Sequence, residues 1–73
     1  MDSRIRVEVI KLPTTKRVVS AFAGDSVRRV LAEAFEGENF SKYSITINGD
    51  AATLDTRVSD GDSIVLASQI KGN

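Results

Sequence analysis

A single amphipathic helix pattern lies among several strand patterns, and it constrains the fold more than any other feature. Apolar side chains recur at i, i+3, i+4, i+7 and i+8 from Val27 to Phe35, which places them on one face of an α-helix. Asp25 or Ser26 can cap its N-terminus, and Gly37 can follow its C-terminus. One short helix must bury its apolar face against another layer, so the pattern predicts a sheet packed on it.

The segment before the helix has the pattern of a β-hairpin. Residues 4–11 alternate between polar and apolar side chains, which is typical of a half-buried strand. Residues 12–14 include the only proline and predict a turn, because proline cannot donate to a strand ladder. Residues 15–22 are predicted as the second strand. Its inward face is ambiguous, because Val18 and Val19 are adjacent.

The segment after the helix predicts three more strands. Residues 43–47 alternate, and Asn48 and Gly49 then separate them from a short strand over 51–54. An Asn-Gly pair between two strand-like runs is a strong hairpin signal, since a type I′ turn needs positive φ at both central residues. A polar loop leads to a last apolar run, which predicts a strand over 62–67.

Together these elements predict an α+β domain in the order ββαβββ, with a mixed sheet of four to five strands packed on one α-helix. The domain is expected to span residues 1–67, followed by a flexible tail over 68–73. The expected core is Ile5, Val7, Val9, Phe22, Val27, Val30, Leu31, Phe35, Ile45, Ile47, Leu54, Val58, Ile64 and Leu66.

Composition excludes several kinds of chemistry. The 73 residues include no cysteine and no histidine, so disulfides, thiolate nucleophiles and the commonest general base are absent. Asp55, Asp60 and Asp62 share one loop, but they lack the acid spacing of a calcium-binding loop, so turn and capping roles are expected and no metal site. We expect no enzymatic activity and no cofactor. Without a signal peptide or an apolar run long enough to span a membrane, a cytoplasmic protein is expected.

Charge is unevenly distributed along the chain. The formal net charge is zero, which makes nucleic-acid binding unlikely. Residues 1–31 nevertheless carry seven basic and three acidic side chains, whereas residues 32–73 carry three basic and seven acidic ones. This asymmetry leaves self-association open, so a self-assembling structural protein is one alternative function.

Four short motifs occur in a characteristic order. They are Ala23-Gly24-Asp25-Ser26-Val27, Ile47-Asn48-Gly49, Leu54-Asp55-Thr56 and Asp60-Gly61-Asp62-Ser63-Ile64. With this order and spacing, essentially the whole chain resembles the ubiquitin-like β-grasp family. The resemblance is closest to the small sulfur-carrier proteins of thiamin and molybdopterin biosynthesis.

This resemblance implies a role for the C-terminal tail. In those carriers the last strand leads to a Gly-Gly end, which a ubiquitin-activating-type enzyme adenylates. Gly72 matches the first glycine, but Asn73 stands in place of the second. The chain is therefore interpreted as a non-enzymatic protein that acts through protein–protein binding, as an adaptor or assembly component. The alternative is a sulfur carrier or protein modifier that is activated at its C-terminus.

Ubiquitin-like proteins usually bind partners through the sheet face that the helix does not cover. A partner-binding surface is therefore predicted there. Its expected residues are Leu12, Thr46, Val65, Ala67 and Ile70. Because Val65 would point away from the core, a change of Val65 to Asp is expected to abolish partner binding and leave the fold intact.

Overall fold

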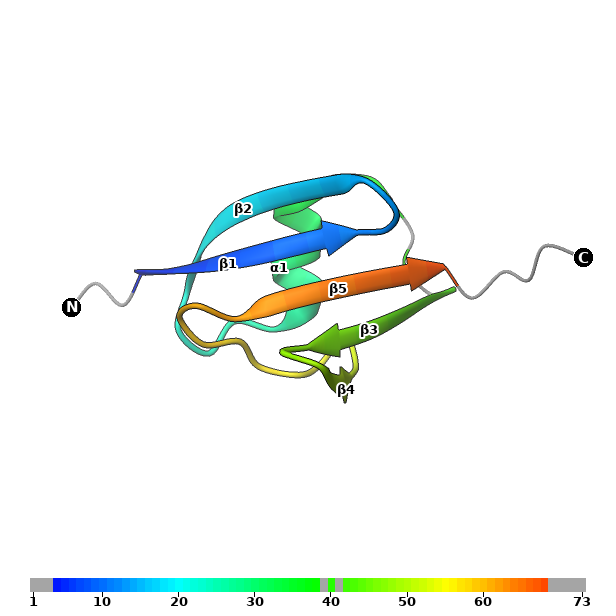
Figure 1. The fold of residues 1–73 in the computed structure, drawn as a ribbon. Coiled ribbons are helices and arrows are strands. Elements are labelled where there is room, and N and C mark those ends of the chain that lie inside the picture. Colours follow the sequence, from blue (N-terminus) through cyan, green and yellow to red (C-terminus); the bar gives the residue numbers. More distant parts are fainter. Residues whose placement is uncertain (1–3, 39, 41, 69–73) are drawn as a thin grey trace, which may run out of the picture.

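A computed structural model of the chain describes residues 4–38, 40 and 42–68. The predicted order of two strands, one helix and three strands is confirmed (Figure 1). The elements are β1 (Arg4–Lys11), β2 (Thr15–Phe22), α1 (Val27–Ala34), β3 (Tyr43–Ile47), β4 (Asp50–Ala52) and β5 (Ser63–Ser68). β5 therefore includes Ser68, the first residue of the predicted tail, and residues 69–73 lie outside the described residues.

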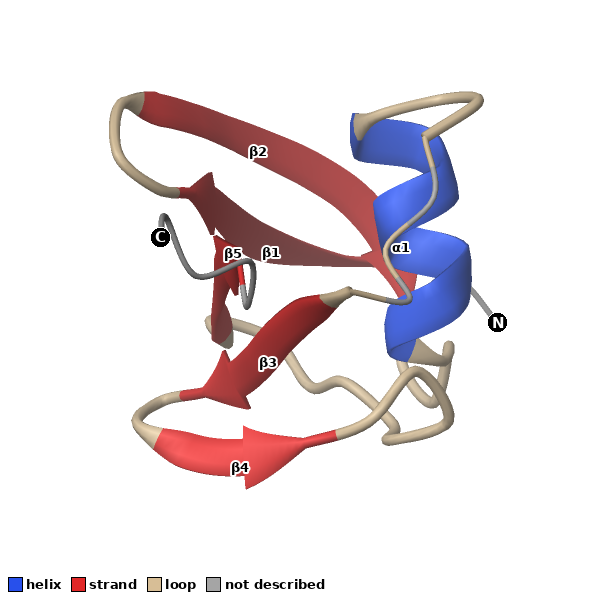
Figure 2. Ribbon diagram, turned by 90° about the vertical axis from the view of Figure 1, so that its right-hand side faces the viewer, coloured by secondary structure: helices blue, strands red, loops and turns tan. Residues whose placement is uncertain are grey.

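The five strands form one mixed sheet in the order β2-β1-β5-β3-β4. β5 pairs in parallel with β1 and antiparallel with β3, so it joins the β1–β2 hairpin to the β3–β4 hairpin. α1 lies against one face of this twisted sheet and leaves the opposite face uncovered (Figure 2). This is the predicted α+β architecture. No helix in the described part of the chain is long and apolar enough to cross a membrane.

Local sequence determines where α1 begins and ends. Ser26, rather than Asp25, is the N-cap, and its Oγ accepts a hydrogen bond from the Arg29 backbone N–H at 3.3 Å. The helix ends at Ala34 with Phe35 as the C-cap, so Gly37 lies one residue further from the helix than predicted. Gly37 still makes the chain reversal, with a φ of +84° that favours glycine.

The core lies between α1 and the sheet, and most of its predicted members are confirmed. Val27, Val30 and Leu31 are 0–1% exposed, and burying each contributes about 1.5–3 kcal/mol relative to exposure. Leu54 is only partly buried and packs against the edge of the core. The buried hydrophobic residues that the prediction did not name are Val19, Ala21, Ala34 and Phe40.

The prediction was wrong about Phe22, and it left the face of Val19 open. Phe22 is 47% exposed, and its ring lies 5.7 Å from the Arg4 guanidinium carbon. Val19 is 7% exposed and pairs with Val7 across the β1–β2 hairpin. Cross-strand partners share a face of the sheet, so the buried position of Val7 places Val19 inside. Phe22 pairs with Arg4 and therefore lies on the other face.

The Asn-Gly hairpin is confirmed. Ile47 pairs directly with Asp50, which leaves Asn48 and Gly49 as a two-residue turn. Their φ angles are +53° and +91°, as a type I′ turn requires. Asn48 also anchors the turn to the last strand, because its Oδ1 accepts a hydrogen bond from the Ser63 N–H at 3.0 Å.

Candidate functional site

The sheet face opposite α1, called the outer face, carries an apolar row that crosses four strands. Strand pairing aligns Ile10 of β1 with Val65 of β5, Val65 with Thr46 of β3, and Thr46 with Ala51 of β4. Neighbouring strands of a sheet lie about 4.7–4.9 Å apart, so directly paired side chains on one face are in contact range. The row therefore forms one continuous surface.

The structure places four of the five predicted partner-binding residues on or beside this row. Thr46, Val65 and Ala67 are half-buried, and Leu12 is 48% exposed in the turn after β1. The Leu12 N–H donates to the Leu66 carbonyl at 2.9 Å, which fixes the turn against β5. The remaining predicted site residues, Ile70, Gly72 and Asn73, lie outside the described residues.

Ile10 belongs to this surface but was not predicted. It is half-buried between Lys16 and Val65 in the sheet register. Every second residue of the alternating segment 4–11 shares the face of Arg4, and that series includes Ile10, so the signal was present in the sequence. We define the apolar patch as Ile10, Leu12, Thr46, Val65 and Ala67.

The other end of the outer face is charged. A depression of about 790 Å³ lies beside the first half of β1, and Arg6, Glu8, Val18 and Asp60 are among its lining residues. Lys16 Nζ approaches Glu8 Oε2 at 2.9 Å. The hydrogen bond from Lys16 holds the pKa of Glu8 below its ordinary value, and the same bond raises the pKa of Lys16. The outer face thus divides into a charged end and an apolar end.

The acidic loop after β4 stabilises turns, as predicted. Asp60 Oδ1 accepts the Arg6 backbone N–H at 3.0 Å, and Asp62 Oδ2 accepts the Ser59 N–H at 2.7 Å. Asp62 Oδ1 also accepts a hydrogen bond from the Asn48 side chain at 3.0 Å. Within the described residues, no group of three or more acidic, His or Cys side chains is arranged to hold a metal ion.

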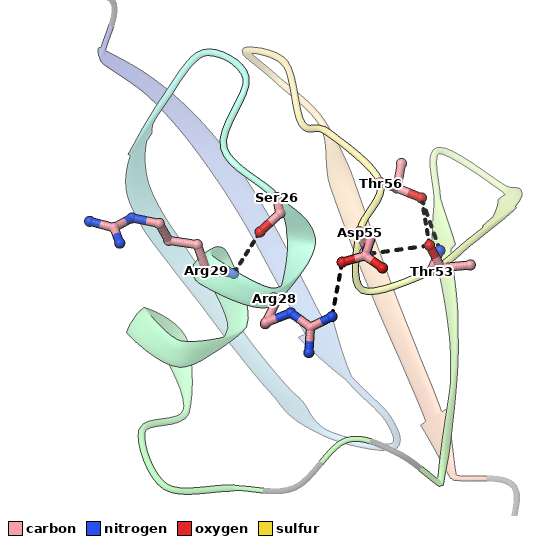
Figure 3. Close-up of polar contacts among 6 residues, drawn as sticks. All are labelled: Ser26, Arg28, Arg29, Thr53, Asp55 and Thr56. Atoms are coloured by element: carbon pink, nitrogen blue, oxygen red, sulfur yellow. Dashed lines mark hydrogen bonds and ion pairs between the residues drawn. The ribbon is translucent and has the colours of Figure 1, made fainter.

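The loop after β4 also supplies hydrogen-bond acceptors to the N-terminus of α1. The Val27 and Arg28 N–H groups donate to the carbonyls of Thr56 and Leu54, at 2.8 and 2.9 Å. The Arg28 side chain reaches Asp55 Oδ1 at 2.9 Å (Figure 3). The first N–H groups of a helix often bind anions when they have no partner. Here the carbonyls of the 54–56 segment accept hydrogen bonds from these N–H groups. This helix end therefore has a structural role.

The buried side chains in the described part of the chain are all hydrophobic. No polar or charged side chain there is buried, and no buried side-chain nitrogen or oxygen lacks a partner. A catalytic acid or base usually needs burial or a close charge to shift its pKa toward neutrality. The pKa of Glu8 is lowered and that of Lys16 is raised, so both move away from neutrality, because each charged form is stabilised.

Comparison with known proteins identifies the fold. No protein-family model and no curated protein sequence matches the chain. Among solved structures, it is similar to a de novo designed protein based on ubiquitin, with a TM-score of 0.75 and 12% identity over 96% of this chain and 94% of that one.

Two natural proteins give similar matches. Small archaeal modifier protein 1 of H. volcanii has a TM-score of 0.71 and 17% identity, over 90% of this chain and 99% of that one. Urm1 from Trypanosoma brucei has a TM-score of 0.62 and 13% identity over 100% of both chains. Together with the mixed five-stranded sheet on a single helix, these similarities show that the chain has the ubiquitin-like β-grasp fold.

Proposed function

We propose that this protein is a non-enzymatic ubiquitin-like adaptor or assembly component, and that it binds another protein through the apolar patch. The observation that carries the proposal is the cross-sheet row of Ile10, Val65 and Thr46 on the face that α1 leaves uncovered. Apolar side chains that gather on an uncovered sheet face are typical of protein-binding surfaces. The fully buried interior of such a patch supplies most of the binding energy when a partner covers it.

The shape and the charges of the outer face support this function. A partner that covers the patch would bury Leu12, which projects from the first turn with 48% of its surface exposed. The charged end, with the Glu8–Lys16 pair, would lie at the polar rim of such an interface.

Affinity capture from the native cell tests this proposal. Wild-type protein would be compared with Val65→Asp, and with Phe22→Asp as a matched control on the same face but outside the patch. Partners are expected to be recovered by the wild type and by Phe22→Asp and to be lost with Val65→Asp, because an aspartate in the patch would be desolvated without a counter-ion. Thermal unfolding would show that all three proteins are folded. Equal recovery with Val65→Asp would contradict the proposal.

A second candidate function is a protein modifier or sulfur carrier. Its support is the fold shared with a protein named as an archaeal modifier, together with the Gly72-Asn73 sequence. Activation would join the terminal carboxylate to the adenylyl group of ATP, with release of pyrophosphate. A side chain at the reacting residue would crowd the nucleotide, so Asn73→Gly is expected to raise the rate of activation and Gly72→Ala to lower it.

Pyrophosphate exchange with a ubiquitin-activating-type enzyme measures that rate, and intact mass spectrometry of the native protein detects its product. Replacement of one carboxylate oxygen by sulfur, or attachment through the tail to another protein, would favour the modifier function. A native protein that is unmodified, combined with no exchange for either the wild type or Asn73→Gly, would exclude it.

A further inference from the structure

β2 forms one edge of the sheet, and its outer backbone groups can be identified from the hydrogen bonds around it. In β1, the Arg6 carbonyl and the Glu8 N–H bond toward the 61–62 segment on the β5 side. Because successive residues of a strand direct their backbone groups to opposite sides, Val7 and its neighbours at odd positions bond to β2. Their partners in β2 are also the odd-numbered residues, such as Val19.

The even-numbered residues of β2 therefore direct their N–H and C=O groups outward, away from β1. Phe22 confirms this direction, since its N–H donates to Asp25 Oδ2 at 3.1 Å and its carbonyl accepts the Asp25 N–H at 2.9 Å. Asp25 thus closes one end of the edge. The stretch that stays open for pairing contains the outward groups of Lys16, Val18 and Ser20.

Natural proteins often protect such an edge with charged side chains. Here the two charged side chains of β2, Lys16 and Arg17, each contact another residue of their own chain. Lys16 pairs with Glu8 at 2.9 Å on the outer face. The Arg17 guanidinium lies 5.2 Å from the centre of the Phe35 ring on the helix side. Val18, the next residue along β2, is 57% exposed, the highest value among the three exposed large hydrophobic residues in the described part of the chain.

We propose that a second copy of this chain pairs with this edge, so that two β2 strands lie antiparallel about a two-fold axis at Val18. In this register Val18 faces Val18 of the other copy, and Lys16 faces Ser20. The outward groups of all three residues then form six hydrogen bonds across the axis. Each Val18 side chain covers the other, and no charged side chain faces another.

The neighbouring two-fold registers are less favourable. A shift of the axis to Arg17 would place two guanidinium groups directly opposite each other, which is destabilising. A shift of the axis to Val19 would place Lys16 opposite Phe22, whose backbone groups Asp25 already occupies. That register keeps only four hydrogen bonds, whereas the Val18 register has six. The arrangement of charge and backbone groups along β2 therefore selects the Val18 axis.

The opposite edge of the sheet does not offer the same surface. It is formed by β4, which has only three residues, and short edge strands pair poorly with other chains. The Val18 register would leave a continuous ten-stranded sheet with a short β4 at each end. The apolar patch would stay accessible on each copy, so this inference is independent of the proposed partner-binding function.

Because the chain has no native cysteine, introduced thiols can test the register. Paired residues that exchange hydrogen bonds have Cα atoms about 5.5 Å apart, whereas residues four positions out of register are about 14 Å apart. A short bis-maleimide crosslinker reaches the first separation and not the second. Val18→Cys should therefore crosslink with itself, and Lys16→Cys and Ser20→Cys should each stay uncrosslinked alone but crosslink when mixed.

Sedimentation velocity over a wide concentration range measures the association itself. The contact is narrower than the roughly 800 Å² per partner of a standard interface, so we expect a weak dimer that is populated at high concentration. Val18→Lys should raise the dissociation constant about tenfold or more, by placing like charges on the axis, while Val18→Thr should change it little. Circular dichroism would verify that both variants are folded.

Three results would overturn the proposal. One is a monomer at every concentration with no Val18→Cys crosslink. Another is equal crosslinking at all three positions, which indicates random collision. The third is a dimer that Val18→Lys leaves unchanged, because that dimer must use another surface. A dimer that survives Val65→Asp but not Val18→Lys would support this inference whatever the fate of partner binding.

Discussion

Two adjacent residues of β5 should differ sharply in their effect on stability. Ile64 is 0% exposed and pairs with Val9 and Ile47, which are both in the core. Val65 is half-buried on the outer face, where its sheet neighbours are Ile10 and Thr46. We therefore predict that Ile64→Ala strongly destabilises the domain and that Val65→Ala does so only slightly.

The expected magnitudes follow from burial. Ile64→Ala removes a fully buried side chain and leaves a cavity, which costs about 2–5 kcal/mol. Val65→Ala removes two half-buried methyl groups and some strand propensity, about 1 kcal/mol in all. A domain of this size has a free energy of unfolding of about 4–11 kcal/mol. Ile64→Ala should therefore remove a large fraction of it, and Val65→Ala only a small fraction.

Urea unfolding and thermal melting measure both effects. At about 4–8 °C per kcal/mol, Ile64→Ala should lower Tm by roughly 8–40 °C and Val65→Ala by roughly 4–8 °C. The urea m-value should stay constant if both variants unfold as the wild type does. Equal losses of stability for the two variants, or a greater loss for Val65→Ala, would refute the assignment of the two faces of β5.

Three further predictions concern local interactions. Ser26→Ala removes the side-chain acceptor of the Arg29 N–H and should lower the free energy of unfolding by about 1 kcal/mol in urea titration, with Ser26→Asp as the conservative control. Gly49→Ala meets no steric contact but must adopt a φ of +91°, so a loss of about 1–2 kcal/mol is expected, and no loss would exclude the type I′ turn. The lowered pKa of Glu8 stabilises the fold above the ordinary value of 4.5, and that stabilisation is lost as pH falls through the folded pKa. Glu8→Gln should therefore lower Tm near neutral pH and not in acid, a difference that added salt should reduce, whereas a pH-independent difference would contradict the Lys16 pairing.

Periodicity alone recovered most of the fold. The limits of β1, β2 and β3 agree with the predicted ranges, because strict alternation or a proline turn bounds each of them. The Asn48-Gly49 turn was equally well determined, since few residues tolerate positive φ. These elements were predictable because a short stretch of sequence contains all the physical information that sets them.

The errors arose where the outcome depends on distant residues. Val18 and Val19 are both suited to a core, and only the pairing of Val19 with Val7 decides which one is buried. The three-residue turn over 12–14 fixes that pairing, so a register argument would have excluded Phe22 from the core. Ile10 was missed in the apolar patch because its importance depends on Val65, more than fifty residues later in the chain.

The central position of β5 has a consequence for how the protein is made. Residues 63–68 lie between the two hairpins, and the 54–56 segment supplies the carbonyls that complete the first turn of α1. A nascent chain that has released only β1, β2 and α1 from the ribosome therefore has a hairpin and a helix with an incomplete first turn. Folding as a cooperative unit therefore requires that residue 68 has emerged, and until then the β1–β2 hairpin is the part most exposed to chaperones.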